Sequence, residues 1–226
     1  MAAIHPPSSN HYEPQARYSH CSAFVNGKIF MYGGHIFGHM LTQPPTVVCV
    51  FDPATEKWGQ ITTMGPPPPG FITASCTAIG VHLYIFAGWN RISFFNNIQD
   101  LNTANLKWTQ LNDANQGEAP MAKFGAAMIS YNEKILITIG GYGILPSHRR
   151  SGTEYIPSQN FPLHGWTNEL LCFDVNSSEL YVHSHSFTSL HTATVLCVIL
   201  VGDQNTSYNK DWVIRVPWTA GSSLML

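Results

Sequence analysis

The sequence predicts an all-β protein, and composition, turn chemistry and an internal repeat support this prediction. Only 11% of its 226 residues are charged, whereas 12% are aromatic, and 18 Gly and 15 Pro accompany them. Turn-forming residues mixed with aromatic and β-branched residues are typical of short strands joined by tight turns. The low charge argues against a coiled coil, since long exposed helices need many charged residues.

A glycine doublet recurs at the end of a short apolar strand. It is found as Gly33-Gly34 and as Gly140-Gly141, and Ala87-Gly88 occupies the equivalent position between them, at a spacing of about 50 residues. Glycine suits positions where φ is positive or where a neighbouring backbone leaves no room for a Cβ atom. We therefore expect each doublet to lie at a special backbone position.

A turn followed by a large apolar residue recurs in the same order. Phe51-Asp52-Pro-Ala-Thr-Glu-Lys-Trp58 is matched by Leu101-Asn102-Thr-Ala-Asn-Leu-Lys-Trp108, and more weakly by Phe173-Asp174-Val-Asn-Ser-Ser-Glu-Leu180. Asp and Asn form turns because their side chains accept backbone hydrogen bonds. Trp58 and Trp108 offer large apolar faces, so we expect both to pack between adjacent sheets.

This order of glycine doublet, turn and tryptophan resembles the kelch repeat family, and the resemblance covers residues 14–182. It implies a β-propeller with repeats at about 14–65, 66–117 and 118–186, a degenerate fourth at 187–226, and a flexible segment at 1–13. About four blades would give an incomplete or open ring, because kelch propellers usually close with six or seven. Such a ring would expose apolar faces near Phe24 and Ile199, and could associate through its terminal blades.

Charge and cysteine content restrict the partners and the compartment. The net charge is −2 and no basic stripe is present, so we expect no nucleic acid partner. The sequence also shows no signal peptide and no apolar run long enough to span a membrane. Five cysteines without a Cys-x-x-Cys pair favour reduced, buried thiols, and hence a cytoplasmic protein without membrane attachment.

The resemblance places partner binding on the loops after the glycine doublets, together with the loops between blades. Residues 142–168 form a long insertion there, which is either a variable segment without a partner or a recognition element. In relatives, cations near this face bind acidic peptides, and the resemblance implies the same role for Arg17 and Lys123. Alternatively, each of the two pairs with a carboxylate or backbone group of a neighbouring blade. The expected contact residues to a protein or peptide are Arg17, His35, Trp89, Arg91, Lys123, Tyr142, Arg149, Arg150, Tyr155 and Trp166.

No motif predicts catalysis or a cofactor. The pairs His35/His39 and His183/His185 lack a third ligand at suitable spacing, so we expect no metal. Hydrolase, zinc-protease and phosphate-loop motifs are absent from the sequence. The sequence thus favours a non-catalytic kelch interaction module. The alternatives are a metal-dependent kelch enzyme or specifier-like protein, and a truncated copy without independent function.

Overall fold

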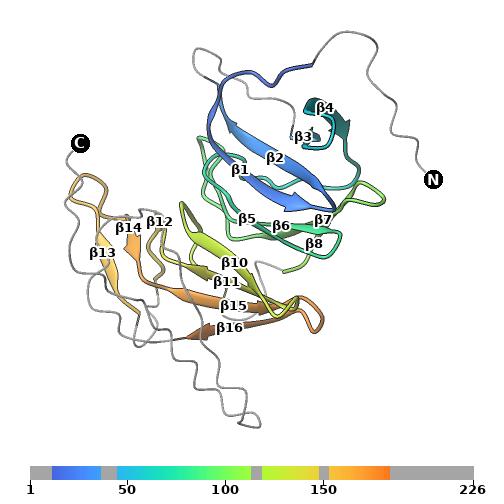
Figure 1. The fold of residues 1–226 in the computed structure, drawn as a ribbon. Coiled ribbons are helices and arrows are strands. Elements are labelled where there is room, and N and C mark those ends of the chain that lie inside the picture. Colours follow the sequence, from blue (N-terminus) through green and yellow to red (C-terminus); the bar gives the residue numbers. More distant parts are fainter. Residues whose placement is uncertain (1–11, 37–44, 113–118, 148–152, 184–226) are drawn as a thin grey trace, which may run out of the picture. The chain divides into compact units, whose positions relative to one another are not determined.

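The computed structural model describes residues 12–36, 45–112, 119–147 and 153–183, which all belong to one compact unit spanning residues 1–193 (Figure 1). Within these residues it contains four antiparallel sheets and no helix. The expected fold class is confirmed: the described chain is part of a kelch-type propeller, and its strands form no closed ring.

Three of the sheets follow the expected repeats, each with its strands in chain order. The first sheet contains β1 (Tyr18–Val25), β2 (Lys28–His35), β3 (Val47–Asp52) and β4 (Lys57–Thr62). The second contains β5 (Ser75–Ile79), β6 (His82–Phe86), β7 (Ile98–Asn102) and β8 (Lys107–Gln110). The third contains β10 (Ala127–Tyr131), β11 (Ile135–Ile139), β15 (Leu170–Asp174) and β16 (Glu179–His183). The degenerate fourth repeat at 187–226 lies outside the described residues.

The glycine doublets occupy the special backbone positions that the sequence predicts. Gly33 has a φ of +68°, and a Cβ atom there would collide with the carbonyl group of Phe71 in the next repeat. Gly141 has a φ of +109°, and its Cβ would lie 2.9 Å from the carbonyl oxygen of Phe124. The expectation of a positive φ or of a close contact is therefore confirmed.

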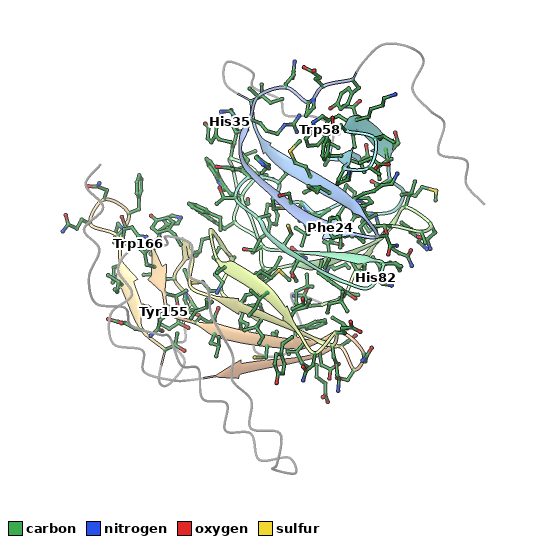
Figure 2. The ribbon with its side chains drawn as sticks, viewed as in Figure 1. Phe24, His35, Trp58, His82, Tyr155 and Trp166 are labelled. Atoms are coloured by element: carbon green, nitrogen blue, oxygen red, sulfur yellow. The ribbon has the colours of Figure 1, made fainter. Side chains whose placement is uncertain are left out.

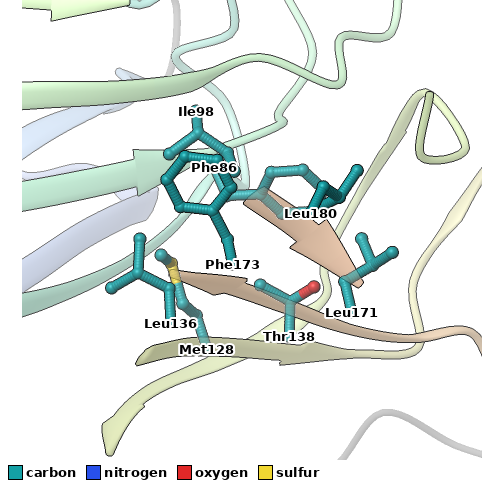
Figure 3. A pocket seen from close by; sticks show the side chains of 8 residues that line it. All are labelled: Phe86, Ile98, Met128, Leu136, Thr138, Leu171, Phe173 and Leu180. Carbon is teal, nitrogen blue, oxygen red and sulfur yellow. The ribbon is translucent and has the colours of Figure 1, made fainter. Parts of the chain in front are cut away.

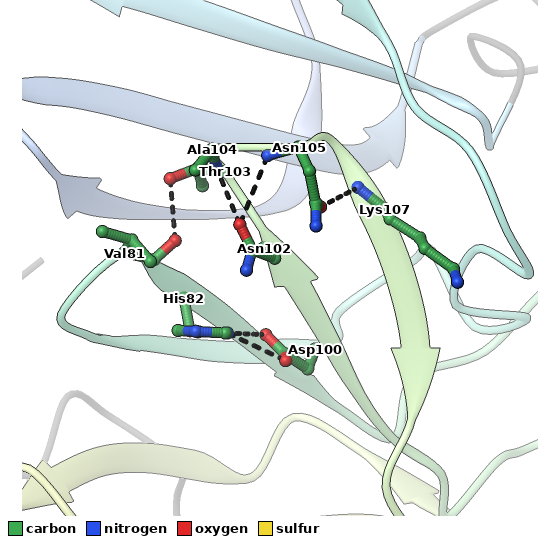
Figure 4. A network of polar contacts seen from close by, with 8 residues as sticks. All are labelled: Val81, His82, Asp100, Asn102, Thr103, Ala104, Asn105 and Lys107. Carbon is green, nitrogen blue, oxygen red and sulfur yellow. Dashed lines mark hydrogen bonds and ion pairs between the residues drawn. The ribbon is translucent and has the colours of Figure 1, made fainter. Parts of the chain in front are cut away.

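The recurring turns use the same side-chain chemistry in all three sheets. A carboxylate or amide oxygen accepts a hydrogen bond from the backbone N–H two residues later, at 2.9–3.0 Å. The accepting residues are Asp52, Asn102 and Asp174, and Figure 4 shows the turn at Asn102. Lys28 forms an ion pair with Asp52 at 3.2 Å, and Lys134 forms one with Asp174 at 2.8 Å. These hydrogen bonds explain why the motif requires Asp or Asn.

The first core packs the second sheet against the first. Trp108 is fully buried in it and meets Tyr32 edge-on, with ring centroids 5.5 Å apart. Trp108 therefore packs between sheets, as expected. Trp58 differs: it is only half-buried and contacts Phe51 of its own sheet at 5.1 Å. No described sheet lies against this side of the first sheet, and this explains the difference.

A second core lies between the second and third sheets, and it contains a small hydrophobic hollow (Figure 3). The hollow is lined by Phe86, Ile98, Met128, Leu136, Thr138, Leu171, Phe173 and Leu180. Its one polar side chain, Thr138, has no hydrogen-bond partner for its hydroxyl oxygen. A ligand site normally brings several polar groups together, so we interpret the hollow as packing between sheets.

The insertion at 142–168 forms strands of a fourth sheet. This sheet has the order β13–β14–β12–β9 and is referred to below as the small sheet. Its strands are β9 (Lys123–Phe124), β12 (Tyr142–Ile144), β13 (Tyr155–Pro157) and β14 (His164–Thr167). The expected third repeat thus holds a complete blade-type sheet and, between β11 and β15, most of a second sheet.

Candidate partner-binding surface

The small sheet has one exposed face, and aromatic side chains cover it. Strand register places Phe124 opposite Tyr142, and Tyr142 opposite Trp166. Residues directly opposite each other in a sheet point to the same face, and so do residues two positions apart along a strand. Ile144 and His164 therefore share this face with the three aromatic residues.

The other face of the small sheet is buried and lined by small or paired groups. Gly143 and Gly165 alternate with the aromatic residues along β12 and β14, and both are buried. A Cβ atom on Gly143 would overlap the carbonyl group of Ala122, and one on Gly165 that of Ile156. These glycines let neighbouring backbones approach closely, so the bulky side chains of β12 and β14 occupy the outer face.

Aromatic contacts extend from the small sheet to the loop that follows β6. Phe94 stacks on Phe124 at 5.5 Å and contacts His164 at 5.4 Å. Tyr142 meets Trp166 at 4.9 Å. We call the whole group the aromatic cluster, and it consists of Trp89, Phe94, Phe124, Tyr142, Phe161, His164 and Trp166.

Two members of the cluster remain largely open to solvent, and the other five are partly buried. Trp166 is 50% exposed and Phe161 59%, and the neighbouring chain adds Ile144 at 44% and Leu163 at 75% (Figure 2 labels Trp166). Scattered apolar residues are normal on a surface, but a contiguous group of large exposed rings marks an interaction site. Tyr and Trp also dominate the binding energy of protein interfaces.

Two of the expected contact residues are buried, which corrects the prediction at those positions. Lys123 is fully buried, and its Nζ lies 2.9 Å from Oε2 of Glu169, also fully buried. Glu169 also accepts a hydrogen bond from the backbone N–H of Met121, so this carboxylate holds the chain entering the small sheet. Tyr155 points to the buried face and is 6% exposed. Neither Lys123 nor Tyr155 can therefore present its side chain to a partner.

The cations expected at this surface have partners within the chain. Arg91 is exposed, and its Nη2 donates to the ring of His35, 2.6 Å from Nδ1. Arg17 donates through Nη1 to the carbonyl oxygen of Gly33 at 3.2 Å, so it pairs with a backbone group of its own sheet. Arg149 and Arg150 lie outside the described residues.

Phe94, Phe124 and His164 belong to this surface but were not predicted from the sequence. A signal for the last was present: Tyr142-Gly-Ile144 and His164-Gly-Trp166 each place glycine between two large residues, a pattern of two short one-sided strands. The other two could not be assigned, because only strand pairing brings Phe124 beside Tyr142.

One further polar pair lies on the second sheet. His82 Nδ1 lies 2.9 Å from both carboxylate oxygens of Asp100 (Figure 4), and burial raises the pKa of Asp100 despite this contact. Among the described residues no hydroxyl or thiol hydrogen-bonds to His82, so the pair there lacks a nucleophile. No three His, Cys, Asp or Glu in the described ranges are grouped to hold a metal; His39 and His185 lie outside those ranges. No described helix is long and apolar enough to cross a membrane.

Comparison with known proteins agrees with this geometry. The class that the structure defines is an all-β repeat protein of the propeller type. The model of the KLHDC2/KLHL20/DRC7 kelch-repeats domain matches residues 3–208, so the chain belongs to the kelch repeat family.

Three similar proteins illustrate the relationship. Human Kelch domain-containing protein 2 is 24% identical over 177 residues, covering 73% of this chain and 43% of that protein. Bovine Kelch domain-containing protein 3 is 29% identical over 98 residues, covering 42% and 25%. Acyl-CoA-binding domain-containing protein 4 of Arabidopsis thaliana is 23% identical over 193 residues, covering 60% and 29%. The chain thus spans less than half the length of these relatives.

Proposed function

We propose that this chain is a non-catalytic kelch module that binds another protein through the aromatic cluster. The observation that carries the proposal is the exposure of two rings of the cluster, Trp166 in the small sheet and Phe161 in the loop before β14, which are 50% and 59% exposed. A partner that covered these rings would remove a large apolar area from water, at roughly 25 cal/mol per Å² before the costs of association.

The surroundings of the cluster support a peptide or loop that combines apolar side chains with an acidic group. Arg91 is an exposed cation in the loop that also carries Phe94, and the described residues offer it no carboxylate. Its guanidinium could exchange the ring of His35 for a bidentate carboxylate, which is the stronger partner. Family members bound to peptides make the same kind of contact, and this resemblance supports the proposal.

We test this function with the purified 226-residue chain and a displayed library of random peptides. We expect the wild type to enrich a related set of sequences with large apolar residues. The variant Trp166→Ala should weaken binding of the enriched peptides at least tenfold, measured by fluorescence anisotropy, because interface tryptophans are frequent hot spots. Phe24→Ala, which removes an exposed ring elsewhere, is the matched control and should bind normally. Absence of enrichment, or equal binding by Trp166→Ala, would overturn the proposal.

We further propose that the protein works in the cytoplasm. The four described cysteines are free thiols, and two of them, Cys21 and Cys76, lie in or against the first hydrophobic core. Free thiols are typical of proteins in a reducing compartment. Fractionation of cells expressing the chain, with marker proteins for each compartment, tests this assignment. Recovery in a secretory fraction would contradict it.

A further inference from the structure

Four consecutive prolines lie in the connection between the first sheet and the second, and we call Pro66–Pro69 the proline run. The ring of proline fixes φ at about −65°, and a proline keeps the residue before it out of the α region. Pro66, Pro67 and Pro68 are each followed by proline, so all three are restricted to extended conformations of the polyproline II type. The structure agrees, because residues 66–68 form neither strand nor turn and their peptide bonds are trans.

Contacts with both sheets hold the proline run in place. Tyr32 of the first sheet donates a hydrogen bond from its hydroxyl group to the carbonyl oxygen of Pro68 at 2.9 Å. Before the run, the backbone N–H of Met64 donates to the carbonyl oxygen of Leu106 at 2.8 Å. After the run, Gly70 packs against the chain that follows β6, where a Cβ atom would lie 2.6 Å from a carbonyl oxygen. The run is therefore already ordered in the protein alone.

The exposure of the four rings follows the threefold symmetry of this conformation. A polyproline II helix has three residues per turn, so residues three positions apart lie on the same edge. Pro66 is exposed, and Pro69 on the same edge is partly exposed. Pro67 on the next edge is partly exposed as well, whereas Pro68 is buried and marks the edge that faces the protein. Two of the three edges are thus accessible from outside.

The surface beside the run is apolar as well. Met64, two residues before Pro66, is 60% exposed. Together with the rings of Pro66 and Pro69 it gives a short apolar surface on a backbone that is fixed at both ends. Ligands that are ordered before binding lose little conformational freedom when they bind.

We propose that the exposed edges of the proline run bind a protein domain with an aromatic-lined groove, of the SH3, WW or EVH1 kind. Such grooves recognise polyproline II segments with prolines at the spacing Pro-x-x-Pro. Pro66 and Pro69 have this spacing, and the buried Pro68 fastens the opposite edge to the first sheet. The proline run shares no residue with the aromatic cluster, so this interaction does not depend on the proposed function.

The first test presents the immobilised 226-residue chain to a panel of purified SH3, WW and EVH1 domains, with binding measured by biolayer interferometry. We expect at least one domain to bind with micromolar affinity, in competition with an oligoproline peptide. Pro66→Ala should weaken this binding at least tenfold without changing the unfolding temperature, because its ring is exposed. Pro53→Ala, at an exposed proline in the turn after β3, is the matched control and should bind normally. A linker that serves rigidity alone would bind none of the domains, and that result, or equal binding by Pro66→Ala, would overturn the proposal.

The second test asks whether the folded protein presents the run. A synthetic peptide of residues 63–71 contains the same four prolines without the contact to Tyr32. The folded chain should bind the same domain at least as tightly as this peptide, because its run is already ordered. A domain that bound the peptide but not the folded chain would show that the run is covered in the protein, which contradicts the proposal.

Two further variants assign the contact to the groove and to the run. Replacing an aromatic residue of the partner's groove by alanine should abolish binding, and retained binding would contradict polyproline recognition. Trp166→Ala should bind the domain as the wild type does, so that failure at the aromatic cluster and failure at the proline run can be told apart. Loss of domain binding in Trp166→Ala would contradict the assignment to the proline run.

Discussion

The indole Nε1 of Trp108 donates a 2.9 Å hydrogen bond to Oγ1 of Thr63, and both side chains are buried. Thr63 follows the last strand of the first sheet, and Trp108 lies in the last strand of the second. The hydroxyl of Thr63 in turn donates to the carbonyl oxygen of Thr46. The polar end of the tryptophan is therefore satisfied while its ring fills the space between two sheets.

Replacing the two motif tryptophans should have unequal effects. Trp108→Ala should lower the free energy of unfolding by about 3–5 kcal/mol, since it empties a fully buried site. Trp58→Ala should cost no more than about 1.5 kcal/mol, because the ring is half-exposed. Urea denaturation of the two variants and of the wild type checks both. Equal losses would contradict the assignment of Trp108 to the core and Trp58 to an open face.

Replacing Gly33 should destabilise the protein much more than replacing a glycine in an open turn. Gly33→Ala forces a Cβ against the carbonyl group of Phe71 and also strains a φ of +68°. Gly80→Ala is the control, because its φ is +57° but nothing lies within 4 Å of the added atom. We expect about 1 kcal/mol for Gly80→Ala and clearly more for Gly33→Ala. Similar unfolding midpoints for the two variants would show that the close approach is unimportant.

Removing one partner of the buried Lys123–Glu169 ion pair should destabilise the protein more than removing both charges. Lys123→Met leaves the Glu169 carboxylate buried without its ammonium partner, and should destabilise the protein by about 3–5 kcal/mol. The double variant Lys123→Met/Glu169→Gln removes both charges and should recover part of this loss. Thermal unfolding of the two variants provides the measurement. A double variant less stable than Lys123→Met would contradict this account.

Alkaline pH should weaken the fold through buried acids that must stay protonated. Burial raises the pKa of Cys172 from 9.0 to about 11 and contributes most to raising that of Tyr84 to about 12. Above pH 9 the unfolded chain loses these protons before the folded protein does, so the free energy of unfolding falls as pH rises. The effect should begin near pH 9 for Cys172 and near pH 10 for Tyr84.

Urea midpoints at a series of pH values measure the loss. Cys172→Ser, compared with the wild type, isolates the thiol. A wild-type free energy of unfolding that stays constant between pH 8 and 11 would contradict the prediction.

Local hydrogen bonds and backbone geometry explain why the repeat could be predicted from the sequence. Asp52, Asn102 and Asp174 bond to backbone groups two residues away, and the positive φ of Gly33 and Gly141 is a requirement of each residue's own backbone. Such short-range needs leave the same residues at the same spacing in every repeat. The fold class and the three blade-type sheets follow from them.

Contacts between residues far apart in the sequence could not be predicted from it. Lys123 and Arg17 occupy the same position in the repeat, yet one is sealed against Glu169, 46 residues away, and the other remains partly exposed. Whether a cation faces a partner or a carboxylate depends on which neighbour the fold supplies.

The sequence by itself determined the all-β architecture, the repeat length and the positions of the turns, because backbone geometry imposes these on nearby residues. Only the tertiary structure decided that residues 142–167 pair with β9 to form a separate sheet, that its aromatic side chains lie together on the exposed face, and that Trp58 remains open while Trp108 is buried. These outcomes depend on which strands meet across long stretches of chain, and residue spacing carries no information about a neighbour that arrives from elsewhere in the fold.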